Sequence, residues 1–117
     1  MTITDYPEDA TGEVVIPAEI GGMPVTGIGS GAFSRCRSLT LVTIPDSVTS
    51  IGSYAFWGCN SLTSIEVAAG NPAYSSLEGV LFNTGQTSLI QFPAGRSGAY
   101  SIPDSVTSIG EGAFSGC

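Results

Sequence analysis

Short runs of alternating apolar and polar residues recur along the chain, and each run has the length of one β-strand. The segments Leu39–Pro45 and Leu62–Val67 read LTLVTIP and LTSIEV, with β-branched residues at every second position. Alternate side chains of a strand point to opposite faces, so this pattern predicts one buried and one exposed face. The residues expected to point inward are Val42, Ile44, Ile65 and Val67.

These strands belong to a repeat. The nine residues IPDSVTSIG occur at Ile44–Gly52 and again at Ile102–Gly110. The phrases IP, IG, AF and C recur in the same order in a longer unit, found at Ile16–Cys36, Ile44–Cys59 and Ile102–Cys117. A period of roughly 20 to 30 residues indicates a solenoid, in which each unit buries its apolar face against its neighbours. By register, the further inward positions are Val14, Ile16, Tyr100 and Ile102.

The rest of the unit predicts a turn and a return to the core. Proline ends each strand because it cannot donate a hydrogen bond to the ladder, and Asp-Ser then turns the chain. Asp46 and Asp104 are therefore expected to be turn formers. Val48 and Ile51 re-enter the core, and the AF and C phrases close the far side. That side is too short for a true helix and predicts a short 3₁₀ or irregular turn.

Composition excludes several classes of function. Of the 117 residues only 11% are charged, the net charge is −7, and there is no histidine. Nucleic acids and anionic membrane surfaces need a basic footprint, so neither is an expected partner. The usual general base and most zinc sites are also missing, and no apolar run has the length of a membrane span. We therefore expect no catalytic site, no metal, no cofactor and no membrane insertion.

The full string L-x-x-β-x-IP-x-S-V-x-x-IG-x-x-AF-x-x-C resembles the BspA-like leucine-rich repeat family, from about Gly12 to Cys117. The resemblance implies a mostly β solenoid with a parallel sheet on its concave face. Asn71–Gly95 resembles the family's long variant repeat, and its GVLF and LIQFP phrases predict a β-hairpin inserted in the convex turn. The first repeat also carries an insertion, between Pro17 and Phe33.

We expect residues 1–117 to form a single domain of about four rungs. Its last repeat lacks a polar cap, which predicts either a piece of a longer array or self-association through the C-terminal end. No secretion leader precedes the repeats in this stretch. Members of the family are chiefly surface or secreted bacterial proteins, so the resemblance implies an extracellular or cell-surface location.

The outward positions of the strands are the first candidate binding site, because solenoids use such flat faces for recognition. They form two columns on the predicted concave face. The residues are Glu13, Val15, Leu41, Thr43, Ser64, Glu66, Ala99 and Ser101. The alternative is a merely solvated sheet, since the columns contain no aromatic residue and no arginine, the usual anchors of a protein interface.

Tyr54 and Trp57 form the second candidate site. The other repeats place glycine and serine at these two positions, so the pair is expected to face outward. Two exposed aromatic rings on one rung can stack on a sugar or fill a partner's pocket. The alternative is that they pack against the neighbouring hairpin, around Val80–Phe92, or against Tyr74.

The three cysteines hold one repeat position, which predicts buried thiols on successive rungs. They are Cys36, Cys59 and Cys117. A disulfide between the first two is an alternative, and Cys117 at the open end is a candidate cross-link between copies.

Three functions follow from these observations. The first is a non-catalytic binding or adhesion module for an extracellular protein of a host or matrix. The second is a carbohydrate-binding module that uses Tyr54 and Trp57, and the third is a structural spacer. Function is expected where the repeats differ, at Leu41, Glu66, the two aromatic residues and the Asn71–Gly95 insertion.

Overall fold

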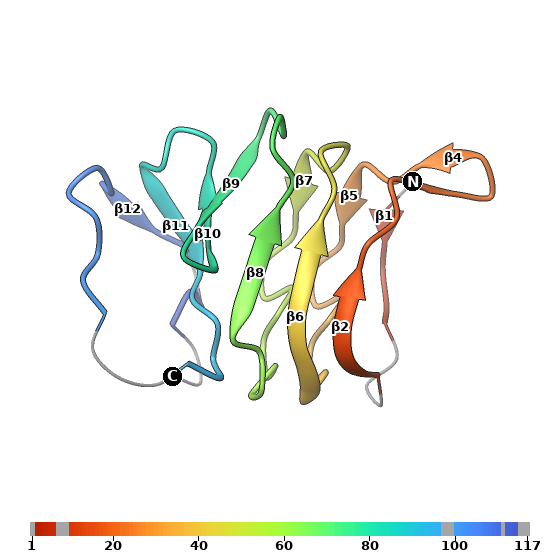
Figure 1. Cartoon of the computed structure of the whole chain (residues 1–117), viewed down its shortest axis with the longest axis horizontal. Helices are drawn as coiled ribbons and strands as arrows, with labels where there is room; N and C mark the ends of the chain where they lie inside the picture. Colours follow the sequence, from red (N-terminus) through yellow and green to blue (C-terminus); the bar gives the residue numbers. More distant parts are fainter. Residues whose placement is uncertain (1, 7–9, 97–99, 111, 115–117) are drawn as a thin grey trace.

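The computed structural model describes residues 2–6, 10–96, 100–110 and 112–114. Over these residues the chain consists of β-strands and turns, without a helix. In Figure 1 strands β2, β6 and β8 stand side by side in front, with β1, β5 and β7 behind them. This arrangement is that of a solenoid, in which every turn of the chain stacks on the previous one.

Three parallel strands form what we call the front sheet. They are β2 (Thr11–Val15), β6 (Ser38–Ile44) and β8 (Ser64–Val67), in that order. Val14, Val42 and Ile65 are paired in register across the sheet, and all three are buried. The predicted strands and their inward side chains are therefore confirmed in these three repeats.

A second parallel sheet lies behind the first. Its strands are β1 (Thr2–Ile3), β5 (Gly27–Ile28) and β7 (Ser50–Ile51), in that order. In the repeat of β6, the turn at Asp46 and Ser47 carries the chain from the front strand to β7. The sequence analysis expected Ile51 to re-enter the core but did not expect a strand there, because two residues are too few for an alternating pattern.

Aromatic rings stack through the core between the two layers. Phe33 and Phe56 hold the same repeat position, and their ring centroids are 5.3 Å apart at an interplanar angle of 13°. Tyr6 continues the stack with its centroid 4.9 Å from that of Phe33. Phe33 and Phe56 are both buried, so the AF phrase builds the centre of the solenoid as its inward assignment predicted.

The insertion in the first repeat is an exposed hairpin. Its strands are β3 (Glu19–Ile20) and β4 (Met23–Pro24), paired antiparallel. The turn between them consists of Gly21 and Gly22, with φ of 59° and 82°. A two-residue hairpin turn of this kind needs left-handed backbone at both positions, which glycine adopts without steric cost.

The insertion after β8 forms a larger antiparallel unit. Its strands are β9 (Tyr74–Leu77), β10 (Val80–Asn83) and β11 (Ser88–Gln91), and β12 (Ser108–Ile109) adds to β11 in parallel. The predicted hairpin is confirmed as the pair of β10 and β11. β9 adds a third strand to this hairpin, and the turn between β9 and β10 lies against β8.

This unit occupies the outer edge of β8. The Ile65 N–H donates to the Gly79 carbonyl oxygen at 2.8 Å, and the Val67 N–H donates to Ser76 Oγ at 3.0 Å. The Leu62 carbonyl oxygen accepts a hydrogen bond from the Gly95 N–H at 2.7 Å. Because these backbone groups are already paired, a fourth strand has no such groups left to pair with at the front sheet.

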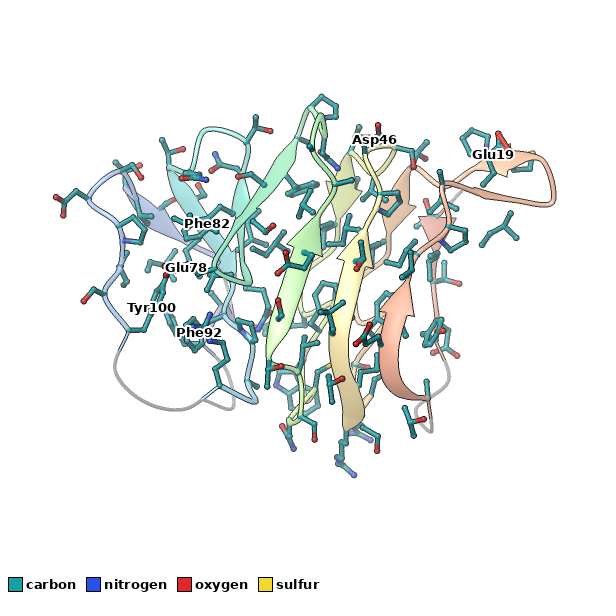
Figure 2. The ribbon with its side chains drawn as sticks, in the orientation of Figure 1. Glu19, Asp46, Glu78, Phe82, Phe92 and Tyr100 are labelled. Atoms are coloured by element: carbon teal, nitrogen blue, oxygen red, sulfur yellow. The ribbon has the colours of Figure 1, made fainter. Side chains whose placement is uncertain are left out.

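The solenoid continues into a fourth turn, as predicted, but the strand expected there at Tyr100–Ile102 is absent from the front sheet. Tyr100, Ser101 and Ile102 form no strand, and Ile102 is 44% exposed rather than buried. Tyr100 packs instead against Phe92, with ring centroids 4.7 Å apart (Figure 2). Ile109, the counterpart of Ile51, is also exposed, at 47%.

Asn71 attaches the insertion to the preceding rung. Its side-chain nitrogen donates to the carbonyl oxygens of Pro45 and Val48, at 3.0 and 2.9 Å. Its side-chain oxygen accepts hydrogen bonds from the N–H groups of Ala73 and Tyr74, at 2.8 and 2.9 Å. This buried amide thus uses both donors and both acceptor positions to fix the start of β9.

Candidate functional site

The outward side chains of the front sheet stand in two columns. Parallel register places Glu13, Leu41 and Ser64 in one column, and Val15, Thr43 and Glu66 in the other. Neighbouring members of a column are about 4.8 Å apart, the spacing of hydrogen-bonded strands. The in-register face that the repeat predicted therefore exists over three strands.

The two remaining candidates of this face do not extend it. Ser101 is exposed but lies in no strand, for the reason given above. Ala99 lies outside the described residues. The face therefore ends at β8, where the turn of β9 and β10 and the segment around Gly95 replace a fourth strand.

The front face has an apolar side and two carboxylates. Val15 is 69% exposed and lies beside Ile3 and Ile20 in a groove of about 310 Å³. Glu13 and Glu66 belong to the two outer strands, and the Ser64 hydroxyl donates a hydrogen bond to the Glu66 carboxylate. This hydrogen bond holds Glu66 over its own strand, where it is paired with Thr43 of β6.

Tyr54 and Trp57 face outward, as expected, with 42% and 41% of their surfaces exposed. They lie against different neighbours. A Cβ atom on Gly112, in the last repeat, would be 2.5 Å from Tyr54 Cε1, so this ring rests on the glycine. The guanidinium carbon of Arg35, in the first repeat, is 5.7 Å from the centroid of the Trp57 ring. The two rings therefore contact opposite neighbours along the solenoid.

Tyr54 has a backbone conformation that its side chain disfavours. Its φ is 58°, in the left-handed region, where the equivalent residues Gly31 and Gly112 have φ of 67° and 74°. A residue other than glycine in this region is destabilised by about 1 kcal/mol or more. The backbone path of the repeat thus requires this conformation, and this rung keeps a tyrosine there in spite of it.

Arg35 also has a left-handed backbone conformation, which the sequence analysis did not identify. Its φ is 62°, and the equivalent residue in the next repeat is Gly58, with φ of 78°. The signal was present in the alignment of the repeats, where an arginine replaces a glycine beside the cysteine. Its stacking on Trp57 adds a cation–π contact to the exposed side of these two rungs.

A pocket that the sequence did not predict opens beside Tyr54. Its volume is about 170 Å³, and Ile51, Phe56 and Ile90 supply apolar parts of its wall. Gln91 also lines it and is only 7% exposed. The pocket lies between the rung of β7 and strand β11. Because β11 belongs to the insertion, these two elements are neighbours only through the insertion.

The cysteines Cys36 and Cys59 are buried thiols, as expected, and no disulfide joins them. The Cys59 thiol donates to the Phe33 carbonyl oxygen, with sulfur and oxygen 3.0 Å apart. Burial, assisted by the nearby Cys36, raises the pKa of Cys59 to about 12. A thiol with so high a pKa is protonated at neutral pH and is a poor nucleophile. Cys117 lies outside the described residues.

Within the described residues, no group of three or more Asp, Glu, Cys or His side chains is placed to bind a metal ion. The same residues contain no helix with the length and apolar character needed to cross a membrane.

The last repeat carries the match to a known family. Residues 92–117 match the family model described as the BspA type leucine rich repeat region (6 copies). The predicted resemblance to BspA-type leucine-rich repeat proteins is confirmed. A comparison with curated protein sequences gives no match.

Solved structures share this leucine-rich repeat fold. A leucine-rich repeat protein from Eubacterium ventriosum is 29% identical with a TM-score of 0.76, over 97% of this chain and 27% of its own. The pneumococcal vaccine antigen PcpA is 29% identical with a TM-score of 0.74, over 81% of this chain and 24% of its own. A leucine rich cell surface protein from Faecalibacterium prausnitzii is 27% identical with a TM-score of 0.57, over 91% of this chain and 39% of its own. The chain thus spans about a quarter of the length of the first two structures.

Proposed function

We propose that this leucine-rich repeat chain is a non-catalytic protein-binding module that acts outside the cell, with its partner on the front sheet. The observation that carries the proposal is the in-register face of β2, β6 and β8, on which Val15 is 69% exposed. A flat face of fixed spacing with an exposed apolar residue favours a folded protein surface as the partner.

The chemistry of the face limits the kind of partner. Leu41 of the middle strand is paired with Glu13, and Thr43 is paired with Glu66. Both acidic residues lie on the outer strands. A complementary surface has an apolar or amide-rich centre and basic groups at its rim. The net charge of −7 favours the same basic partner through long-range attraction.

The extracellular location rests on similarity. One similar structure is a vaccine antigen of pneumococcus and another is a cell surface protein of a bacterium. Together with the repeat family, these names support a display module for adhesion to an extracellular protein of a host or matrix.

The test compares two arginine substitutions in binding to a panel of purified extracellular matrix proteins. Thr43→Arg places a long charged side chain in the middle strand of the front sheet. Ser50→Arg does the same on β7 in the back sheet, where Ser50 is exposed. We expect Thr43→Arg to weaken binding at least roughly tenfold and Ser50→Arg to leave it unchanged.

Two results would contradict the proposal. Equal loss in both variants would place the partner elsewhere or indicate a general effect on folding, which circular dichroism separates. If no protein in the panel binds the parent chain, the spacer function expected as an alternative from the sequence is favoured instead.

A further inference from the structure

We propose that the pocket between β7 and β11 binds one neutral sugar ring of a glycan, with Tyr54 as the stacking surface and Gln91 as a hydrogen-bond acceptor. This site lies beside the back layer of the solenoid and is independent of the partner proposed for the front sheet. It uses Tyr54 but not Trp57, so it differs from a platform made of both rings.

The pocket exists because the insertion interrupts the stacking of the back sheet. β7 pairs with β5, while β11 pairs with β10 and β12 in a separate sheet. The Ile51 N–H of β7 donates instead to the Tyr74 hydroxyl, at 2.8 Å. A space of about 170 Å³ therefore remains where a regular solenoid would have two strands in contact.

Tyr54 forms one wall of this space although its backbone conformation is disfavoured for a tyrosine. Its left-handed conformation suits the glycine found in the equivalent repeats, so the backbone at this position does not favour a tyrosine. Residues held in disfavoured conformations concentrate at binding sites, where the side chain is needed. Gly112 leaves room for the ring, Tyr54 lines the pocket, and 42% of its surface is exposed.

Gln91 supplies a side-chain oxygen that has no hydrogen-bond partner among the described residues. Its amide nitrogen donates to the carbonyl oxygens of Phe92 and Ala113, at 2.9 and 3.3 Å. These bonds fix the orientation of the amide. Its oxygen accepts no hydrogen bond from the described residues. This oxygen is also not fully buried. Gln91 lines the pocket and is only 7% exposed, so the proposal assigns this oriented acceptor to the pocket wall.

These features together select a neutral saccharide. Among the residues that the structure describes, no charged one lines the pocket, which disfavours ionic ligands. An aromatic wall binds the C–H face of a sugar ring. A purely apolar ligand would leave the Gln91 oxygen without a hydrogen-bond donor. The volume is smaller than the roughly 300 Å³ of pockets for drug-sized ligands, so one ring is the expected occupant.

The test is a titration of the isotope-labelled full chain, followed by nuclear magnetic resonance. The probes are methyl glycosides of glucose, galactose and mannose, N-acetylglucosamine, and N-acetylproline amide as a peptide-like ring. We expect at least one sugar to shift the Gln91 side-chain amide and the backbone amides of Ser53 and Gly110. For a ligand this small, the dissociation constant should be on the order of 1 mM.

Two variants each replace an aromatic residue by the residue that the other repeats have at that position. Each variant is the control for the other. Tyr54→Gly removes the stacking wall and relieves the backbone, so it should fold and weaken sugar binding at least roughly tenfold. Trp57→Ser should bind like the parent. Tyr54→Asn, which also tolerates left-handed backbone, replaces Tyr54→Gly if that variant does not fold.

The proposal is overturned by any of four results. Either no sugar shifts the pocket signals, or N-acetylproline amide shifts them and the sugars do not, or binding survives in a folded variant that lacks the Tyr54 ring. Equal loss in Trp57→Ser also contradicts it, because that result requires the two-ring platform.

Discussion

At the residue scale, side chains at the same repeat position are buried to different extents in different rungs. Phe56 is 2% exposed and stacks on Phe33 inside the solenoid. Phe114 has the same place in the last repeat but is 37% exposed and stacks on Phe92. Identity of sequence therefore does not ensure identity of burial, because burial depends on the rung stacked next to it.

This difference predicts unequal effects of one substitution. Phe56→Ala should lower the free energy of unfolding by about 3–5 kcal/mol, because it leaves a cavity in the stacked core. Phe114→Ala should cost less than about 1.5 kcal/mol, since much of its ring is already in solvent. Urea unfolding of both variants measures the difference, and equal losses would contradict the assignment of the first ring as central.

The buried thiol of Cys59 predicts a loss of stability at high pH. Its pKa is about 12 in the folded chain against 9.0 for an ordinary cysteine, because burial and Cys36 disfavour the thiolate. The folded state holds the proton more tightly, so the contribution is complete below pH 9.0 and is lost as the pH rises toward 12. Urea unfolding at about pH 8 and about pH 11 measures it. Cys59→Ala should show a smaller difference between the two, and an unchanged difference would contradict the prediction.

At the element scale, the insertion after β8 decides how the array continues. Two of its contacts with β8 and the residues just before it are made at glycines, which allow close approach of the backbones. A Cβ atom at Gly79 would lie 2.8 Å from Ser64 Oγ, and one at Gly95 would lie 2.5 Å from the Ser61 carbonyl carbon. The edge of the front sheet is thus closed by loops that only small residues permit.

A pair of glycine substitutions tests this closure. Gly95→Ala should lower the free energy of unfolding by about 2 kcal/mol or more, because its methyl group meets backbone atoms. Gly85→Ala should be neutral or stabilising by up to about 1 kcal/mol, since no atom lies within 4 Å of its Cβ position and its φ is not positive. Thermal unfolding compares them, and a stable Gly95→Ala variant would show that the contact is not needed.

At the scale of the whole molecule, the described residues form two unequal cores. Seventeen buried residues belong to the cluster under the first three rungs, and five belong to the one under the insertion and the last repeat. Leu81 of β10 belongs to the larger cluster, while Val80 and Phe82 belong to the smaller one. The strand therefore connects the two parts.

The smaller core predicts that the last repeat opens first. In a solenoid each rung is stabilised mainly by its neighbours, so a rung with few buried residues can unfold locally. Amides of residues 106–110 should exchange with solvent faster than those of Val42 and Ile65, which lie in the front sheet. Native-state hydrogen exchange measures the order, and uniform protection would contradict it.

The sequence by itself determined the three front strands, the inward residues of the first three rungs, the turns and the burial of Cys36 and Cys59. These features follow from local alternation and from repetition in register, which any reader of the chain can count. The tertiary structure alone decided that the insertion occupies the edge of β8, that Tyr100–Ile102 is excluded from the sheet, and that a pocket remains beside Tyr54. Two segments far apart in sequence compete for the same backbone groups there, and no local pattern records which of them pairs.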